Sequence, residues 1–230
     1  MASFLFVHGG CHGVWCWERV LPLVPGKAIE LPGHGPNAAP VGLNEGVDAI
    51  CRVLRAEKAP VTLVGHSLGG MAISGAAEAM PDAVGQLIYL SALLPCDGES
   101  AATISIPPLG AATATKLSDD GKWTVIDPRA APSVFYHDCD AAAVAEALAR
   151  IGPTHFDCIV TPVRLTPERF GRVDKTYVHC LQDRAIEPAA QMTMIRRYPG
   201  IGFAALDCGH SPFLSMPGEL AALLRLLGEG

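Results

Sequence analysis

A strand, a tight turn and a helix follow one another over residues 61–80, and this succession constrains the fold more than any other part of the chain. The apolar run from Val61 to Val64 is rich in β-branched residues, which is typical of a buried parallel strand. Gly-His-Ser-Leu-Gly at 65–69 separates that run from the helix-forming segment Met71–Met80. In this context G-x-S-x-G indicates a nucleophile elbow with Ser67 at its tip.

The two glycines of this motif are a steric requirement. A serine on such a sharp turn takes a strained backbone conformation, and its neighbours must lack Cβ atoms for strand and helix to approach closely. The turn lifts the Ser67 hydroxyl above the sheet edge, at the positive end of the following helix. The N–H of Leu68 then points to where an oxyanion would form. A chance glycine-rich turn is the alternative interpretation.

Composition bounds the class of protein. A chain of 230 residues suits one α/β domain with a large core, and half of its residues are hydrophobic. A net charge of −6 without a Lys/Arg cluster argues against nucleic acid or an anionic membrane as the partner. The opening MASFLFVHGG does not fit a signal peptide, and no stretch approaches the ~20 apolar residues of a membrane span. We expect a single domain, residues 1–230, in the cytoplasm.

Eight cysteines show neither a CxxC motif nor zinc-finger spacing, so we expect reduced, partly buried thiols. His8, Cys11 and His12 flank a glycine turn without a fourth ligand nearby. No metal is therefore expected.

The rest of the chain alternates between strands and helices. The expected strands are Ser3–Val7, Lys27–Leu31, Val61–Val64, Gln86–Leu90, Lys175–Leu181 and Gly202–Leu206. The expected helices are Trp15–Leu23, a segment capped by Asn44 and running to Lys58, Met71–Met80, Ala141–Ile151, Pro188–Arg197 and Pro217–Leu227. Repeated β–α–β units predict an α/β fold, a mostly parallel twisted sheet flanked by helices. Residues 96–172 break the alternation with prolines and a polar turn, and we interpret them as a small inserted cap over the carboxyl edge of the sheet.

A serine hydroxyl is a weak nucleophile, so it needs a general base and a group that orients the base. His210 fits the base, because the strand Gly202–Leu206 and a short turn deliver it to the carboxyl edge of the sheet. Seven other histidines are present. His66 lies inside the elbow, and His8, His12 and His34 lie in loops at the same edge of the sheet. The other three, His137, His155 and His179, fall in cap or strand positions.

Asp183 is the candidate for the orienting acid, because it follows the strand Lys175–Leu181 at the sheet edge. Asp207 lies only three residues before His210, which is too few to turn its carboxylate onto the imidazole. Asp97 is the second choice. A solvated turn aspartate is the alternative interpretation of Asp183.

The second oxyanion donor should come from the loop after the first strand. Gly9 and Gly10 follow His8 there, so the Gly10 N–H can pair with the Leu68 N–H across a developing negative charge.

With these residues in place, the chain resembles the α/β-hydrolase superfamily, and within it the plant methyl esterases, hydroxynitrile lyases and their bacterial esterase relatives. The matching segments leave out only the cap: FLFVHGGCHGVWCW (4–17), LPGHG (31–35), VTLVGHSLGGM (61–71), LIYLSALLP (87–95), YVHCLQDRAI (177–186), QMTMIRRYPG (191–200) and DCGHSPFLSMPGEL (207–220). The resemblance implies Ser67 as nucleophile, Asp183 as acid and His210 as base, in the Ser…Asp…His order of such enzymes. It implies Gly10 and Leu68 as the oxyanion amides, and no cofactor.

Lyases of this group carry a threonine directly after the first-strand histidine and a lysine directly after the catalytic histidine. This chain has Gly9 and Ser211 at those positions. Departing cyanide needs electrostatic help that a serine does not supply, so ester hydrolysis is favoured over cyanide release.

We therefore expect a serine hydrolase, a carboxylesterase, that cleaves small, largely apolar carboxylic esters through an acyl-enzyme. Cys11, His12, Trp123 and Phe135 are candidate pocket residues, with core packing as the alternative for each. The other functions left open are hydrolysis of a lactone, thioester, carbamate or amide, a hydroxynitrile lyase, and a ligand-binding sensor on a hydrolase fold. The expected partner is the small ester; relatives often pair through cap surfaces, so a homodimer is one arrangement to test.

Overall fold

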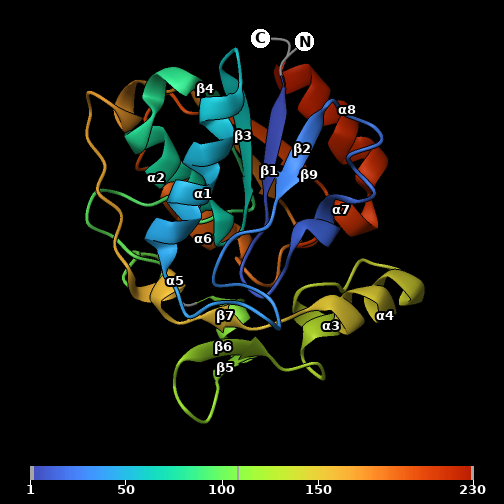
Figure 1. The fold of residues 1–230 in the computed structure, drawn as a ribbon. Helices are drawn as coiled ribbons and strands as arrows, with labels where there is room; N and C mark the ends of the chain where they lie inside the picture. The colour runs from blue at the N-terminus through green and yellow to red at the C-terminus, as the bar shows by residue number, and fades with distance from the viewer. Residues whose placement is uncertain (1–2, 108, 229–230) are drawn as a thin grey trace.

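A six-stranded parallel sheet forms the centre of the molecule in the computed structural model, which describes residues 3–107 and 109–228 (Figure 1). Its strands stand in the order β2-β1-β3-β4-β8-β9. Their bounds are β1 Phe4–Val7, β2 Gly26–Ile29, β3 Val61–His66, β4 Val84–Leu90, β8 Lys175–Cys180 and β9 Gly202–Leu206. Every neighbouring pair is parallel, as the β–α–β alternation predicts.

Helices cover both faces of this sheet (Figure 1). On one face lie α1 (Leu43–Ala56), α2 (Gly69–Ala79) and α6 (Pro188–Ile195), whose apolar residues form one core cluster. On the other face a second cluster joins the 3₁₀ helix η1 (Val14–Trp17), α7 (Pro212–Ser215) and α8 (Pro217–Gly228). The sheet is thus buried from two sides, which is the usual situation of a parallel sheet.

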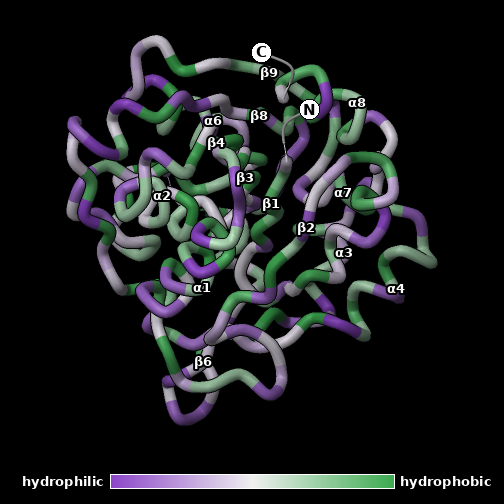
Figure 2. The backbone as a smooth tube through the Cα atoms, turned by 45° about the horizontal axis from the view of Figure 1, so that its top comes forward, coloured by the Kyte–Doolittle hydropathy of each residue, from purple (hydrophilic) through white to green (hydrophobic). Residues whose placement is uncertain are grey.

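Burial on both faces explains the composition of the central strands. All residues of β1 and β3 are buried, and neither strand alternates between polar and apolar side chains. Figure 2 shows hydrophobic residues along β1 and hydrophilic residues on the outer turns near β6.

The segment between β4 and β8 contains a second, three-stranded antiparallel sheet. It is built from β5 (Thr115–Leu117), β6 (Trp123–Ile126) and β7 (Thr154–His155). Figure 1 shows it with two neighbouring helices beyond one end of the parallel sheet. The remaining short elements are η2 Pro81–Ala83, η3 Gly110–Thr113, α3 Ala131–Val134, α4 Ala141–Arg150, α5 Asp157–Val160 and η4 Phe170–Arg172.

Two local expectations are wrong in detail. The segment expected as the helix Trp15–Leu23 contains only the last three residues of η1, and turns follow over 18–23, where the amide of Val20 donates to the Trp17 carbonyl at 3.0 Å. The helix expected to be capped by Asn44 begins two residues earlier, at Leu43 with Gly42 as its N-cap, and the amide of Gly42 donates to the Glu45 carboxylate at 2.9 Å. The side chain of an N3 glutamate therefore does the capping.

Strand order fixes where a ligand can bind. The chain leaves β1 for β2 on one side and returns to β3 on the other, so the connections diverge between β1 and β3. In open α/β sheets the crevice at such a switch point, outside the carboxyl ends of the strands, holds the ligand. The loops that begin at His8 and at Ser67 meet there.

Neither a membrane-spanning helix nor a metal-binding cluster occurs within residues 3–107 and 109–228. No helix in these ranges is long and apolar enough to cross a bilayer. No group of three His, Cys, Asp or Glu side chains in them is arranged to hold a metal ion.

Candidate active site

Ser67 occupies the sharp turn between β3 and α2, with a left-handed φ of 52°. That conformation is costly for a residue with a Cβ atom, and the surrounding backbone holds it in place. A Cβ on Gly65 would lie 3.0 Å from the carbonyl oxygen of Gly69, and one on Gly69 would lie 2.6 Å from that of His8. The glycines thus allow the close approach of strand, helix and β1 loop that the motif predicts.

His210 and Asp183 are joined at the carboxyl ends of β8 and β9. Nδ1 of His210 donates to Oδ2 of Asp183 at 2.8 Å, and both side chains are almost fully buried. The amides of Ala185 and Ile186 donate to Oδ1 of the same carboxylate at 2.7 and 3.0 Å. The bond at Nδ1 leaves Nε2 as the imidazole nitrogen that can accept a proton.

Ser91 and Gln191 complete the environment of Asp183, and no sequence motif marks either residue. The Ser91 hydroxyl donates to Oδ2 of Asp183, and Nε2 of Gln191 donates to the same oxygen at 3.2 Å. Ser91 directly follows β4 at the carboxyl edge, a position that could have drawn attention to it. Gln191 lies inside α6, where no local pattern marks a glutamine that faces a strand end.

The elbow and the His210 loop are connected through His66. Nε2 of His66 donates to the His210 carbonyl at 2.9 Å, and the two imidazole rings are 4.6 Å apart. No hydrogen bond joins the Ser67 hydroxyl to another described residue. Catalytic hydrogen bonds are often long in empty sites and tighten when substrate binds.

Two backbone amides next to Ser67 have no acceptor within the described residues. They are the N–H groups of Gly10 and Leu68, and both residues line the same cavity as Ser67. Both residues are only half-buried, so these N–H groups stay open to whatever enters the cavity. A pair of such donors beside one serine is the arrangement in which an oxyanion can be held.

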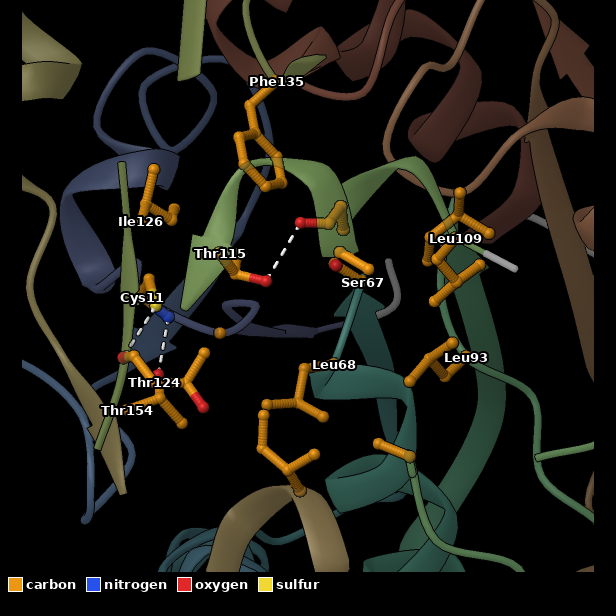
Figure 3. Close-up of a pocket in the computed structure, with 16 residues that line it drawn as sticks. Cys11, Ser67, Leu68, Leu93, Leu109, Thr115, Thr124, Ile126, Phe135 and Thr154 are labelled. Carbon is orange, nitrogen blue, oxygen red and sulfur yellow. Dashed lines mark hydrogen bonds between the residues drawn. The ribbon is translucent and has the colours of Figure 1, made fainter. Parts of the chain in front are cut away.

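The cavity that contains Ser67 has a volume of about 210 Å³. This is smaller than the roughly 300–1,000 Å³ of pockets for drug-sized ligands. Its walls carry no ionisable side chain other than the Cys11 thiol, and most of them are aliphatic. Figure 3 shows Leu93 and Leu109 on one side of Ser67, with Cys11, Thr115, Thr124 and Thr154 on the other.

Of the four candidate pocket residues, Cys11 and Phe135 line this cavity, whereas His12 and Trp123 do not. His12 is turned into the protein: its Nδ1 donates to the Gly10 carbonyl and its Nε2 accepts from the Tyr136 hydroxyl, each at 2.8 Å. Trp123 packs edge-on against His155, with ring centroids 4.9 Å apart. Periodicity in a loop-rich segment did not reveal which way these rings point.

Burial sets the protonation of the groups around the cavity. Desolvation lowers the pKa of His12 to about 4, so its ring is neutral at physiological pH and keeps both hydrogen bonds. Desolvation also raises the pKa of the Cys11 thiol to about 11. Because the thiolate is the reactive form, Cys11 does not compete with Ser67 as a nucleophile.

The competing acids lie elsewhere. Asp97 accepts from the amide of Leu165 at 2.8 Å, and Asp207 accepts from the exposed Gln182 amide at 2.7 Å. Neither is hydrogen-bonded to His210 among the described residues.

Comparison with known proteins agrees with this geometry. The sequence model of the alpha/beta hydrolase family matches residues 4–223. The chain belongs to the alpha/beta hydrolase family. The family resemblance expected from the motifs is thereby confirmed, and the parallel sheet with its flanking helices is the family fold.

Similar proteins are named as methylesterases and as a pyrethroid hydrolase. The chain is 25% identical to Methylesterase 9 of Arabidopsis thaliana over 253 residues, which covers 100% of this chain and 99% of the relative. It is 27% identical to the pyrethroid hydrolase of Sphingobium wenxiniae over 240 residues, covering 96% and 85%. The crystal structure of a pyrethroid hydrolase from Sphingobium faniae superimposes with a TM-score of 0.89 at 25% identity, covering 100% of this chain and 98% of that one.

Proposed function

We propose that this hydrolase cleaves small, largely apolar carboxylic esters through an acyl-enzyme on Ser67. The observation that carries the proposal is the pair of unbonded amides, Gly10 and Leu68, at the cavity that Ser67 lines. The buried bond between His210 and Asp183 supports it, because that bond orients an imidazole in the way a general base requires. The similar proteins include methylesterases, whose name states an action on esters, and a pyrethroid hydrolase.

The reaction has two steps. Oγ of Ser67 attacks the ester carbonyl carbon while its proton passes to Nε2 of His210, and the amides of Gly10 and Leu68 stabilise the tetrahedral oxyanion. The C–O bond to the alcohol then breaks, and His210 returns the proton to the leaving alkoxide. A water molecule, deprotonated by His210, attacks the acyl-serine and releases the acid. Asp183 stabilises the imidazolium in both steps and keeps the ring in place.

The walls of the cavity set the substrate class. A small cavity without a charged side chain favours neutral esters with short hydrocarbon groups, because burying an unpaired charge there would be costly. Residues 96–172 would act as the cap, since Ile126 and Phe135 of this segment line the cavity together with Ser67 of the elbow. Ser211 directly follows His210 in the sequence, at the position where a lysine would assist the release of cyanide. An uncharged serine at this position favours ester hydrolysis. The homodimer and the cytoplasmic location stay predictions.

The proposal is tested with p-nitrophenyl esters of increasing acyl length. Wild-type protein should hydrolyse the shorter members, and Ser67→Ala should lower kcat by a factor of at least ~10³ while it keeps the wild-type circular dichroism. Ser133→Ala is the matched control, because that exposed hydroxyl donates only to the Ala130 carbonyl. Mass spectrometry after a fluorophosphonate should place the adduct on Ser67. Equal activity of wild type and Ser67→Ala would end the proposal.

A further inference from the structure

The cavity is polar on one side only. Thr124 on β6 and Thr154 on β7 are directly opposite each other in the small antiparallel sheet, and both line the cavity. In Figure 3 they lie with Cys11 on one side of Ser67, and Leu93 and Leu109 lie on the other. The two groups that flank an ester carbonyl bound at Ser67 would therefore meet different surroundings.

The hydroxyl of Thr154 has hydrogen-bonding capacity left over. Its oxygen accepts the N–H of Cys11 at 2.6 Å, which accounts for a lone pair but not for the hydroxyl proton. The residue is fully buried, and the described residues hold no oxygen or nitrogen that accepts this proton. The neighbouring Cys11 thiol is a poor alternative, because sulfur accepts weakly and the thiol itself donates to the Thr124 carbonyl at 3.4 Å.

Thr124 adds a second hydroxyl to the same wall. Its side chain makes no hydrogen bond within the part of the chain that the structure describes. Directly opposite residues in an antiparallel pair have Cβ atoms about 4.5–5.5 Å apart, so one substrate oxygen can lie within reach of both hydroxyls.

Thr115 shows that a threonine in this cavity need not be available. It lines the same cavity, but its hydroxyl donates to the Ala111 carbonyl at 3.0 Å (Figure 3). Thr115 and Thr154 have the same side chain and line the same cavity, but the hydroxyl proton of Thr115 is already donated inside the protein and that of Thr154 is not.

We propose that Thr154, with Thr124, forms a donor subsite for an oxygen atom in one flanking group of the ester. The substrate class is then an ester with an ether, carbonyl or hydroxyl oxygen on the Thr154 side and a hydrocarbon group on the Leu93 side. A buried hydroxyl that donates to such an oxygen favours it over a methylene group, because the methylene would leave the donor unpaired. The inference rests on the ester hydrolysis proposed above.

Two substrate pairs test the inference. In p-nitrophenyl methoxyacetate and butanoate an ether oxygen replaces a methylene of the acyl group, and in the 2-methoxyethyl and butyl esters of one acid it does so in the alcohol group. Thr154→Val should lower kcat/KM for the ether member of one pair roughly threefold to tenfold more than for its hydrocarbon partner. The quantity compared is the ratio of kcat/KM for the ether ester to kcat/KM for its hydrocarbon partner. Comparing this ratio between the variant and wild type cancels the difference in intrinsic reactivity between the two esters.

Three variants serve as controls. Thr154→Ser keeps the hydroxyl and should restore the wild-type ratio of kcat/KM between the ether ester and its hydrocarbon partner. Thr124→Val should lower this ratio for the same pair of esters that responds to Thr154→Val. Thr115→Val should leave the ratio as in wild type, since its hydroxyl is already used inside the chain.

The outcomes separate the two proposals. If Thr154→Val lowers kcat/KM equally for both members of each pair, Thr154 only holds the Cys11 amide in place, and the subsite is overturned. An unchanged kcat/KM for all four esters would overturn the subsite as well. A wild-type protein that hydrolyses none of the four esters would overturn the proposed function, and the subsite with it. If wild type is active but the ratio does not respond to Thr154→Val, the subsite alone is wrong.

Discussion

Ser91 and Asp183 lie 92 positions apart in the sequence, yet the hydroxyl of one donates to the carboxylate oxygen that His210 also binds. Ser91 is held there by backbone pairing, since its amide donates to the Val178 carbonyl at 3.0 Å. Its left-handed φ of 42° turns the side chain at the end of β4 towards the acid loop. A costly backbone conformation is thus kept at a residue whose side chain contacts the proposed acid.

Ser91→Ala should lower kcat for ester hydrolysis by about tenfold with little change in KM, because a hydrogen bond to a charged group stabilises by roughly 1.5–3 kcal/mol. Steady-state kinetics on a p-nitrophenyl ester measures this split. Ser91→Gly is the matched variant, since it also lacks the hydroxyl but accepts φ of 42° without strain. It should melt at a higher temperature than Ser91→Ala and be equally impaired. Wild-type kcat in either variant would contradict the positioning role of Ser91.

Gln191 in α6 is hydrogen-bonded to the loop that carries Asp183. Its Oε1 accepts from the Cys180 amide at 3.1 Å, and its Nε2 contacts the Ile186 carbonyl at 2.7 Å besides Asp183. Gln191→Glu removes these donors and sets a second carboxylate beside the first, so the free energy of unfolding should fall by roughly 2–4 kcal/mol. Urea unfolding measures the loss. Gln182→Glu also sets one carboxylate beside another, Asp207, but at an exposed position, so it should cost no more than about 1 kcal/mol.

The glycine pair after β1 should respond unequally to alanine. A Cβ on Gly9 would lie 2.8 Å from Cβ of Ser67, whereas the nearest atom to a Cβ on Gly10 is the end of the Leu68 side chain at 3.1 Å. The elbow cannot move aside, but a leucine methyl can. Gly9→Ala should therefore lower kcat/KM by more than about a hundredfold, since small misplacements of reacting groups are that costly. Gly10→Ala should lose much less, and the reverse order would contradict this account of the loop.

Buried histidines should make the fold sensitive to acid. Desolvation lowers the pKa of His8 to about 4 and that of His34 to about 3, and their rings are 5.0 Å apart. Below the unfolded pKa of about 6.5, the unfolded chain binds protons that the native protein does not. The free energy of unfolding should therefore fall on acidification, by about 1.4 kcal/mol per pH unit for each such histidine, down to its folded-state pKa.

His34→Phe removes one of these groups and keeps a planar ring. Its free energy of unfolding, measured in urea at about pH 6 and about pH 5, should depend on pH less steeply than that of wild type, by up to about 1.4 kcal/mol per unit. Equal slopes for the two proteins would show that His34 is already protonated in the native state over this range.

Local sequence determined the elbow, the parallel strands and the family of this protein. These features depend on neighbours in the chain: a buried strand, two glycines and a helix over 61–80, and a strand-ending loop that carries His210. The same reasoning predicted that Asp183 lies at the sheet edge near His210, where the two side chains are hydrogen-bonded, because parallel strands end at one edge.

Only the tertiary structure decided what surrounds these residues. Ser91, Gln191 and Thr154 reach the site through side-chain directions that depend on strand register and on the packing of an irregular segment, and such long-range contacts leave no period in the sequence. The rings of His12 and Trp123 do not line the cavity, and their directions also depend on long-range packing. Motif spacing determines which backbone positions lie close together. The hydrogen-bond partner of each buried donor and acceptor depends on the complete tertiary structure.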